Sequence, residues 1–456
     1  MRMTPLFPEL EDESHRMSVC LGRIPEMWNR NVHYFGNVRE MFFGNEQQVG
    51  ELERRVGGVE SHGGRLLPIL NLMYRGRGEN TLYLEKMPDL ILNEYFQDLR
   101  LSLPKVDILP QNLYHDPLTL IRKVERDLPE WIDGYVTDAV LDELSVKAGV
   151  PTVTTYHASR LGNHKGALHR HLELRGIPVF PTYYASHPGE VDGCLDRLQA
   201  QAFQSAAVKS VIGASGVGLQ RISTTPGERV SIDESYFFEG SCMVQGWLDT
   251  SRPEVEEVLS PSVQVFLKEN VVSLFDITEQ FLSAASLFKG NECPPSYLEW
   301  PDHAGIRQEL IRQAEIVAAW LHEVGVRGAA SIDFLVARGE KDFTVYVCEA
   351  NARVTGATYP SLLARHFHEG GAWVMRNLKF QHPVPTAQLL SILNTHRYLY
   401  ELGMERGLMP YNLYTCDQGR VEQGQFLVIA PEIMTCKGLL LEAERDIPID
   451  WEYERA

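Results

Sequence analysis

The sequence predicts an α/β fold, because helix and strand signals alternate along three long stretches of the chain. Residues 138–153 read as a helix that is closed by Gly149 and followed by a β-branched segment, a step typical of layered α/β domains. Residues 165–212 continue the alternation, with two amphipathic helices and an apolar strand. Residues 328–349 read as a hairpin of two strands. We therefore expect an α/β protein that contains α+β lobes.

Length and composition place the chain among ordinary globular proteins. Its 456 residues correspond to about three structural units at ~150 residues each. Hydrophobic residues make up 44% and charged residues 23%, which suffices for a large core. The 43 Lys and Arg residues are outnumbered by 61 Asp and Glu residues, so the net charge is −18. Because such a surface repels phosphate backbones, nucleic acid is not an expected partner.

The cysteine pattern and the start of the chain point to the cytoplasm. Seven cysteines lie far apart with no CxxC pair, which argues against a zinc ribbon and against a disulfide-stapled secreted domain. No apolar signal segment follows the first residues, and no window approaches the ~18 apolar residues of a membrane span. We expect a cytoplasmic protein without membrane association.

The first 155 residues are predicted to form one domain with short buried strands. The apolar run at residues 66–70 is interpreted as one of these strands. Arg65 lies directly before it, behind Gly63 and Gly64, and two interpretations stay open: a cation that holds a substrate carboxylate, or an ordinary structural arginine. Later in the chain, an apolar stripe over residues 306–324 predicts a long helix that ends at Gly325.

A glycine-rich loop follows the apolar strand near residue 210. Lys209 lies on the strand, and the loop contains Gly213, Ala214, Ser215, Gly216 and Gly218. Glycines let backbone N–H groups approach phosphate oxygens, and a lysine on the preceding strand adds positive charge. The loop lacks the Gly-Lys-Ser/Thr of a P-loop and the GxGxxG pattern. It is interpreted either as a phosphate-binding loop or as a flexible hairpin turn.

The hairpin at residues 328–349 carries the strongest chemical signal. With its turn centred near residues 340–341, Asp333 falls opposite Cys348 or Glu349, at the ~4.5–5.5 Å Cβ separation of paired strand residues. Asn351 projects to the same face as Glu349 if the strand continues. Two facing acids repel each other unless they share a cation, and oxygen ligands suit Mg²⁺. The alternative is a solvated hairpin with scattered acids, but Arg353, whose planar donor fork suits phosphate oxygens, favours a metal–phosphate site.

In combination these motifs resemble the ATP-grasp superfamily. Its motif order is matched by Lys165, by Lys209 with the glycine-rich loop, and by Asp333 with the stretch from Glu349 to Gly356. Within the superfamily the chain is most similar to pheganomycin-type peptide ligases. The resemblance implies an ATP-grasp fold with four segments: an N-terminal pre-ATP-grasp substrate domain (1–155), a small lobe or lid (156–245), a large lobe with the metal site (246–380) and a C-terminal extension (381–456).

The resemblance also implies roles for individual residues. Lys165 and Lys209 would hold nucleotide phosphates under the glycine-rich loop, and Asp333, Glu349 and Asn351 would bind one or two Mg²⁺ ions. Arg353 would be catalytic, facing the γ-phosphate and the developing acyl phosphate. A hinge at Gln245, Trp247 and Leu248 would pair with adenine, although for Trp247 alone a core strand residue is the favoured interpretation. Thr355 and Tyr359 are candidate substrate-side residues.

The implied reaction is ATP-dependent amide formation between a small-molecule carboxylate and an amino-acid or peptide amine, in the biosynthesis of peptide natural products such as antibiotics. ATP and Mg²⁺ are the expected cofactors, and relatives suggest a homodimer. Two alternatives stay open: an ATP-grasp enzyme with another nucleophile, such as a thiol or bicarbonate, and a non-catalytic ATP-binding regulatory module. The histidines at 164, 169 and 171 are expected on a helix surface.

Overall fold

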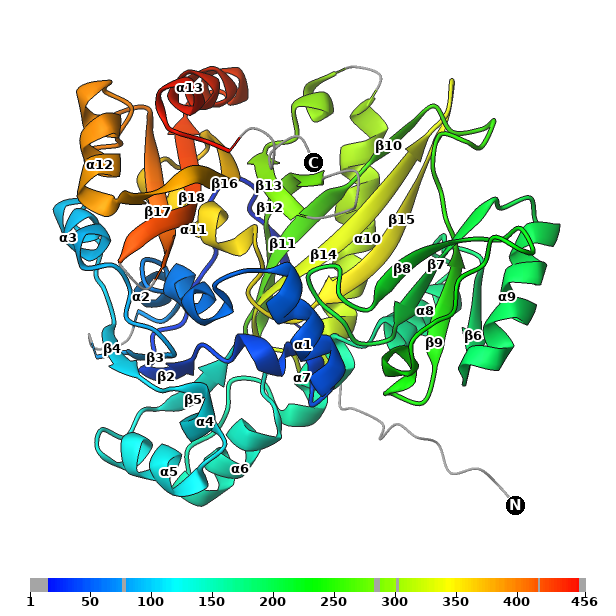
Figure 1. Ribbon diagram of the computed structural model, residues 1–456, viewed down its shortest axis with the longest axis horizontal. Coiled ribbons are helices and arrows are strands. Elements are labelled where there is room, and N and C mark those ends of the chain that lie inside the picture. The colour runs from blue at the N-terminus through cyan, green and yellow to red at the C-terminus, as the bar shows by residue number, and fades with distance from the viewer. Residues whose placement is uncertain (1–14, 76–78, 283–287, 301–302, 417–418, 451–456) are drawn as a thin grey trace.

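Three β-sheets and the helices that cover them make up the protein. The computed structural model describes residues 15–75, 79–282, 288–300, 303–416 and 419–450 (Figure 1). Two sheets have four strands each and the third has ten. Within the described residues, no helix combines the length and the apolarity that crossing a bilayer requires.

The N-terminal sheet is parallel, with the strand order β4-β3-β2-β5. Its two central strands are buried along their whole length, as expected for strands covered by helices on both faces. The strands are β2 (Val32–Phe35), β3 (Thr81–Leu84), β4 (Lys105–Ile108) and β5 (Trp131–Gly134). The helices are η1 (Val38–Phe42), α1 (Glu46–Arg55), η2 (Val59–Leu66), α2 (Leu70–Met73), α3 (Leu90–Asp98), α4 (Gln111–Tyr114), α5 (Pro117–Glu125) and α6 (Ala139–Ala148). An aspartate side chain caps each of α3, α5 and α6 at its N-terminus.

The strand expected at residues 66–70 is absent, and this interpretation was wrong. The segment instead lies in the 3₁₀ helix η2 and the turn that leads into α2. A short apolar run has the same sequence appearance in a buried helix as in a buried strand. Here Leu66, Leu67, Ile69 and Leu70 are all buried, so the run is buried on every side without pairing to a strand. The consequence is that Arg65 lies at the end of η2, pointing toward the interior rather than along a sheet edge.

The second sheet is antiparallel and stands to one side of the molecule (Figure 1), with the order β6-β9-β7-β8. Two helices lead into it, α7 (Tyr156–Gly162) and α8 (Lys165–Leu174), and α9 (Pro188–Ala200) packs on it. The strands are β6 (Thr182–Ala185), β7 (Ser205–Ser210), β8 (Leu219–Ser223) and β9 (Cys242–Gly246), with η3 (Glu234–Phe237) before the last. Its own small core joins Leu195 and Leu198 of α9 to Val208 and Val244.

The ten-stranded sheet forms the centre of the molecule, in the order β10-β14-β11-β12-β13-β16-β18-β17, with β15 beside β14 and β1 beside β12. Its first members are β1 (Arg16–Val19), β10 (Glu257–Leu259), β11 (Pro261–Leu267), β12 (Val271–Leu282), β13 (Phe288–Cys293), β14 (Gly328–Arg338) and β15 (Phe343–Asn351). The helix predicted at 306–324 is α10 (Ala304–Glu323), which follows η4 (Ser296–Glu299) and places Ile306, Leu310, Val317 and Leu321 on the sheet.

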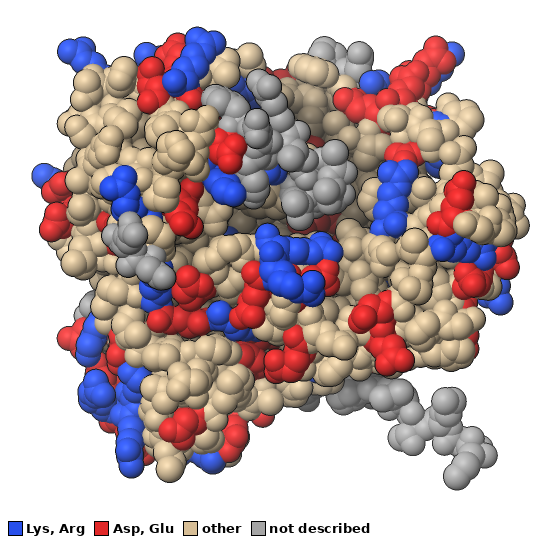
Figure 2. All heavy atoms as spheres, in the orientation of Figure 1, with Lys and Arg blue, Asp and Glu red and all other residues tan. Residues whose placement is uncertain are grey.

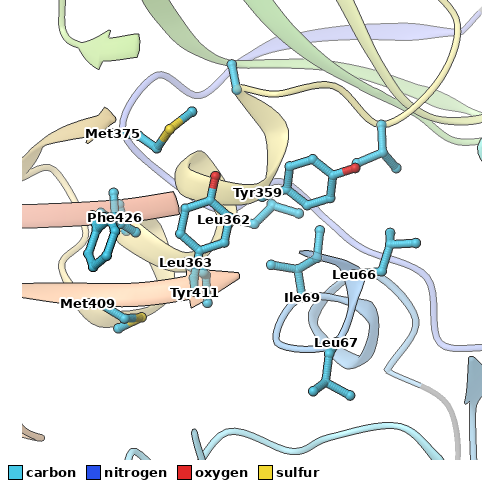
Figure 3. Packing of buried hydrophobic residues seen from close by; sticks show 14 of the residues in the cluster. Leu66, Leu67, Ile69, Tyr359, Leu362, Leu363, Met375, Met409, Tyr411 and Phe426 are labelled. Atoms are coloured by element: carbon cyan, nitrogen blue, oxygen red, sulfur yellow. The ribbon is translucent and has the colours of Figure 1, made fainter. Parts of the chain in front are cut away.

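The C-terminal segment extends the same sheet. It contributes β16 (Ala372–Pro385), β17 (Gly407–Thr415) and β18 (Arg420–Ala430), with α12 (Thr386–Thr395) and α13 (Ile433–Asp446). The helix α11 (Thr358–Phe367) lies between this part and η2, and Figure 3 shows Tyr359, Leu362 and Leu363 of α11 between the strand residues Tyr411 and Phe426 and the N-terminal residues Leu66 and Ile69. One continuous core therefore joins both ends of the chain.

Candidate functional site

A cavity of about 730 Å³ is lined by residues of the second sheet, of the ten-stranded sheet and of helices and loops in the N-terminal segment. Figure 2 shows a face that is hollowed near its centre, with positive and negative side chains interspersed around it. Cavities of roughly 300–1,000 Å³ are the usual size for small-molecule sites. Every residue that the sequence proposed for the site lines this cavity: Lys165, Lys209, Gly213, Ala214, Ser215, Gly216, Gly218, Gln245, Trp247, Leu248, Asp333, Glu349, Asn351 and Arg353.

The two acids of the predicted hairpin face each other. Asp333 on β14 pairs with Glu349 on β15, and a bulge between Asp333 and Phe334 takes Cys348 out of the pairing. Asn351 pairs with Ser331, one step further along the same face. Its Nδ2 donates to Asp333 Oδ2 at 3.0 Å, and Ser262 Oγ donates to Asp333 Oδ1 at 2.7 Å. The register predicted for the hairpin is confirmed, and Ser262 is a partner that the sequence gave no signal for.

Lys165 links the acid pair to the glycine-rich loop. Its Nζ lies 3.0 Å from Glu349 Oε2 and donates to the carbonyl oxygen of Gly213 at 3.1 Å. Burial, followed by the charge of Glu349, raises the pKa of Asp333 to about 6. Burial alone would raise the pKa of Glu349 too, but Lys165 and Arg353 outweigh it and hold that pKa below its ordinary value. Glu349 is thus neutralised by protein cations, whereas Asp333 forms no ion pair with a cation of the described residues.

These three side chains fit a hard divalent cation. Asn351 donates its amide nitrogen to Asp333, which leaves its carbonyl oxygen available beside two carboxylates. A cation here would relieve the repulsion that raises the pKa of Asp333. An all-oxygen set with few protein ligands suits Mg²⁺, which usually keeps substrate phosphates and water as further ligands. Among the described residues, no group of three or more His, Cys, Asp or Glu side chains forms a different metal site.

Lys209 approaches the same point from the second sheet. Its Nζ lies 5.9 Å from the centroid of the Phe180 ring, which stacks on Tyr346 of β15 at 4.6 Å. Burial lowers the pKa of Lys209, and Cys348 and Glu349 oppose that shift. The ammonium group of Lys209 therefore lies near the stacked rings of Phe180 and Tyr346, and this stack contacts the hairpin.

The glycine-rich loop closes the cavity between β7 and β8. Its backbone requires glycine at two positions, since Gly216 and Gly218 have φ values of 73° and 72°. A Cβ on Gly213 would lie 2.8 Å from the carbonyl oxygen of Val217, so this position is also closed to side chains. Arg55 of α1 donates to the carbonyl oxygen of Gly216 at 3.2 Å, which ties the loop to the N-terminal segment. The loop is therefore a turn of defined backbone conformation and not a flexible hairpin.

The predicted hinge lies at the far side of the cavity from the loop. Gln245 is buried on β9, and its Nε2 donates to Thr182 Oγ1 at 2.9 Å. Trp247 and Leu248 follow the end of β9. The ring of Trp247 is half-buried and has the Arg221 guanidinium 5.0 Å from its centroid, so it is not a core strand residue. These residues form a partly apolar wall suited to a flat ring.

Arg353 is positioned by a residue that the sequence did not suggest. Its guanidinium donates to Asn163 Oδ1, which also accepts from the backbone nitrogen of Ala352 at 3.2 Å. Asn163 caps the end of α7, so this short segment orients the arginine toward the cavity. Burial lowers the pKa of Arg353, opposed by Glu349 and Asp333.

The predicted helix-surface histidines are corrected in part. His169 is buried, with 6% exposure, and its ring packs against Tyr184. His164 is the N-cap of α8, where Nδ1 accepts from the backbone nitrogen of Ala167 at 3.1 Å. Sequence spacing could not show that the second sheet covers this helix. Both histidines have structural partners.

A second group of side chains lines the cavity from elements other than the β14–β15 hairpin. It consists of Arg65 with Tyr135, Tyr359 and Tyr414, from η2, the N-terminal domain, α11 and β17. The Arg65 guanidinium lies 5.1 Å from the centroid of the Tyr359 ring, and its Nε donates to the carbonyl oxygen of His62 at 3.1 Å. Tyr359 donates its hydroxyl to Tyr135 at 2.7 Å. We call this group the tyrosine cage.

Solved structures share this architecture over nearly the whole chain. An ADP complex of an N5-carboxyaminoimidazole ribonucleotide synthetase aligns with a TM-score of 0.59 at 12% identity, covering 92% of this chain and 97% of that one. A biotin carboxylase from Campylobacter jejuni aligns with a TM-score of 0.58 at 12% identity, covering 92% of both chains. The chain has an ATP-grasp fold. The fold class expected from the motifs is thereby confirmed.

Two further comparisons add a curated relative and a third solved structure. A curated protein from Niallia circulans, a [butirosin acyl-carrier protein]–L-glutamate ligase, is 26% identical over 295 residues, covering 63% of this chain and 64% of the relative's own length. The biotin carboxylase domain of the Hydrogenobacter thermophilus 2-oxoglutarate carboxylase, a dimer with MgADP, ADP and bicarbonate, aligns with a TM-score of 0.54 at 12% identity, covering 93% and 91%. No protein-family model matches the sequence.

Proposed function

We propose that this protein is an ATP-dependent ligase that activates a carboxylic acid as an acyl phosphate and transfers the acyl group to an amine. The observation that carries the proposal is the convergence of six charged or polar side chains on one cavity of about 730 Å³. They are Lys165, Lys209, Asp333, Glu349, Asn351 and Arg353. Folds of this kind host several activities, so the function is inferred from the site and not from the fold.

In the first step a carboxylate oxygen of the acid attacks the γ-phosphorus of ATP and the bond to the β-phosphate oxygen breaks, which gives an acyl phosphate and ADP. In the second step the amine attacks the acyl carbon, inorganic phosphate leaves and the nitrogen loses a proton. Bound Mg²⁺ would neutralise phosphate charge and align the oxygens. The site needs no protein nucleophile, and the residues that line it supply cations and metal ligands.

The chain's own residues would divide this work by position. Lys165 and Lys209 would bind phosphate oxygens beneath the glycine-rich loop. Asp333, Glu349 and Asn351 would hold the metal, and Arg353, fixed by Asn163, would face the phosphoryl group that moves. Residues 156–245 would form the lid, residues 246–380 the lobe with the metal site, residues 1–155 the substrate domain and residues 381–456 the extension.

A thiol is the second candidate acceptor, because the Niallia circulans relative is named for joining L-glutamate and an acyl-carrier protein. An amino acid such as glutamate would then be the acid in both versions, and antibiotic biosynthesis would be the setting, as the butirosin relative suggests. A homodimer is also proposed, and sedimentation of the full chain tests it.

Phosphate release with hydroxylamine as the trapping nucleophile tests the first step. We expect ADP, phosphate and a hydroxamate from an acid in a panel of amino acids and simple carboxylates. A later screen of amines and thiols in place of hydroxylamine identifies the acceptor class. Tight binding of ATP with no release of phosphate for any acid would contradict the ligase and favour a regulatory module.

A further inference from the structure

We propose that the tyrosine cage is a carboxylate-binding subsite, in which Arg65 holds a second carboxylate of the acid that is activated at Arg353. The inference rests on the proposed ligase function and adds the class of its substrate: a short acid with two carboxylates. Nothing in the reaction itself requires the second carboxylate, so Arg65 would decide specificity rather than take part in the chemistry.

Arg65 differs from Arg39 and Arg365 in its partners. Arg39 pairs with Glu85 and Glu53, and Arg365 pairs with Asp276. In the part of the chain that the structure describes, no carboxylate forms an ion pair with Arg65, whose partners there are the His62 carbonyl, the Tyr135 hydroxyl and the Tyr359 ring. Removing a guanidinium from bulk water without pairing it with an anion costs free energy. A ligand carboxylate would supply this anion and accept two parallel hydrogen bonds from the guanidinium.

The groups around Arg65 favour an anion of this kind. The hydroxyls of Tyr359 and Tyr135 already donate, to Tyr135 and to the His62 carbonyl, whereas the hydroxyl of Tyr414, which also lines the cavity, can donate to a carboxylate. Burial, followed by the charge of Arg65, lowers the pKa of His62 to about 3, so the imidazole stays neutral. Arg65 therefore supplies positive charge in the cage, and His62 does not.

A second observation marks the cavity as a place for a ligand. Gln425, which is 2% exposed and lines the cavity, donates its Nε2 to Asn377 Oδ1 at 2.8 Å, while its Oε1 has no hydrogen-bond partner among the described residues. Gln425 pairs with Asn412, whose Oδ1 lies 2.8 Å from where a Cβ on Gly64 would be. Gln425 thus lines the same cavity as Arg65, and an N–H group of a bound ligand would satisfy its acceptor.

Arg65 and Arg353 line the same cavity, and Tyr359 lies next to Arg65, with its ring centroid 5.1 Å from the guanidinium. The two guanidinium groups therefore face one ligand space. A linear diacid such as glutarate or L-glutamate has the matching chemistry, one carboxylate for each cation.

The experiment compares the wild type with Arg65→Met, Arg65→Lys and the control Arg54→Met, a change on the exposed face of α1. Hydroxylamine-trapped phosphate release is measured with glutarate, L-glutamate, butyrate and 4-phosphonobutyrate. We expect the wild type to have a KM for glutarate or L-glutamate at least 10-fold below that for butyrate. Arg65→Met should raise the KM for the diacids roughly 10- to 100-fold and leave that for butyrate unchanged, with Arg65→Lys in between.

Calorimetric binding of Mg-ADP shows whether each variant is folded and keeps its nucleotide site, and we expect Kd within twofold of the wild type. The proposal is overturned if Arg65→Met keeps the preference for diacids, if butyrate serves the wild type as well as glutarate, or if the phosphonate is preferred. If no acid supports phosphate release, the ligase function is contradicted. The subsite is then tested separately, by calorimetric titration of glutarate into the complex of the protein with a non-hydrolysable ATP analogue. Binding that Arg65→Met abolishes supports the subsite, and no binding to the wild type overturns it.

Discussion

Two parts of the cavity differ in how their buried charges are compensated: the metal end, with Asp333, Glu349 and Asn351, and the tyrosine cage. At the metal end, Glu349 is paired with Lys165 at 3.0 Å, and Asp333 is held by hydrogen bonds from Ser262 and Asn351. At the tyrosine cage, Arg65 meets a backbone carbonyl and aromatic rings but no carboxylate of the described chain. The first part has its opposite charges already in place, whereas the second lacks its anion.

This difference separates the chemistry from the choice of substrate. In the proposed mechanism, Lys165 and Glu349 would release each other, Lys165 to bind phosphate and Glu349 to bind metal, with little change in net charge. An unpaired cation gains most from a ligand that brings its own negative charge. Variants at the metal end should therefore affect kcat, and variants at the cage should affect the KM for the acid.

The largest expected effect comes from Glu349→Ala. We expect kcat to fall about a thousandfold or more, because a metal ion supplies several kcal/mol of charge stabilisation and this change removes a ligand. The measurement is ADP release under saturating acid, with melting temperature as the check on folding. Glu340→Ala, in the exposed turn of the same hairpin, is the matched control and should keep wild-type activity. Substantial ADP release by Glu349→Ala would remove the metal end from the mechanism.

Arg353→Lys should have the next largest effect, a decrease in kcat of about 100-fold with little change in the KM for the acid. A lysine keeps the charge but cannot reproduce the planar fork that Asn163 orients. Steady-state kinetics with the acid and ATP varied separately give both constants. If the KM for the acid rises while kcat is unchanged, Arg353 binds the acid. The expected division, in which metal-end variants change kcat and cage variants change the KM for the acid, would then be contradicted.

The sequence predicted the metal end better than the cage, for a physical reason. Asp333, Glu349 and Asn351 belong to one hairpin, so the period of a strand and the centre of a turn suffice to bring them together. Lys165 and Lys209 are farther away in the chain, and motif order identified them. Pairing across a local turn is encoded within about twenty residues.

The cage, in contrast, gathers side chains from opposite ends of the chain. Arg65 and Tyr414 are brought together because η2 packs on β17, which is a long-range contact with no local pattern. Because the apolar run after Arg65 predicts a strand, the sequence gives no sign of the 3₁₀ helix and turn that direct this side chain inward. Asn163 and Ser262 were missed in the same way, because each supports a site residue from another element.

A smaller effect is expected from Tyr359→Phe, which removes the hydroxyl that donates to Tyr135 at 2.7 Å. Tyr135 keeps an acceptor in the carbonyl oxygen of His62 at 3.3 Å, so the loss of stability should be about 1 kcal/mol, measured by urea unfolding. The KM for the diacid should rise about threefold with kcat unchanged. A fall in kcat without a change in KM would assign Tyr359 to the metal end instead.

The smallest expected effect is the absence of a pH dependence at the cage. His62 would strengthen the binding of an anion only when protonated, and with a pKa of about 3 it is neutral at every pH above 5. Burial raises the pKa values of Tyr135, Tyr359 and Tyr414, so their hydroxyls stay protonated up to pH 9. The KM for glutarate should therefore be constant between pH 6 and pH 9, a range in which its carboxylates are ionised. If the KM instead decreased as the pH fell through about 6.5, an ordinary histidine would be titrating, and the cage would hold a second, switchable cation beside Arg65.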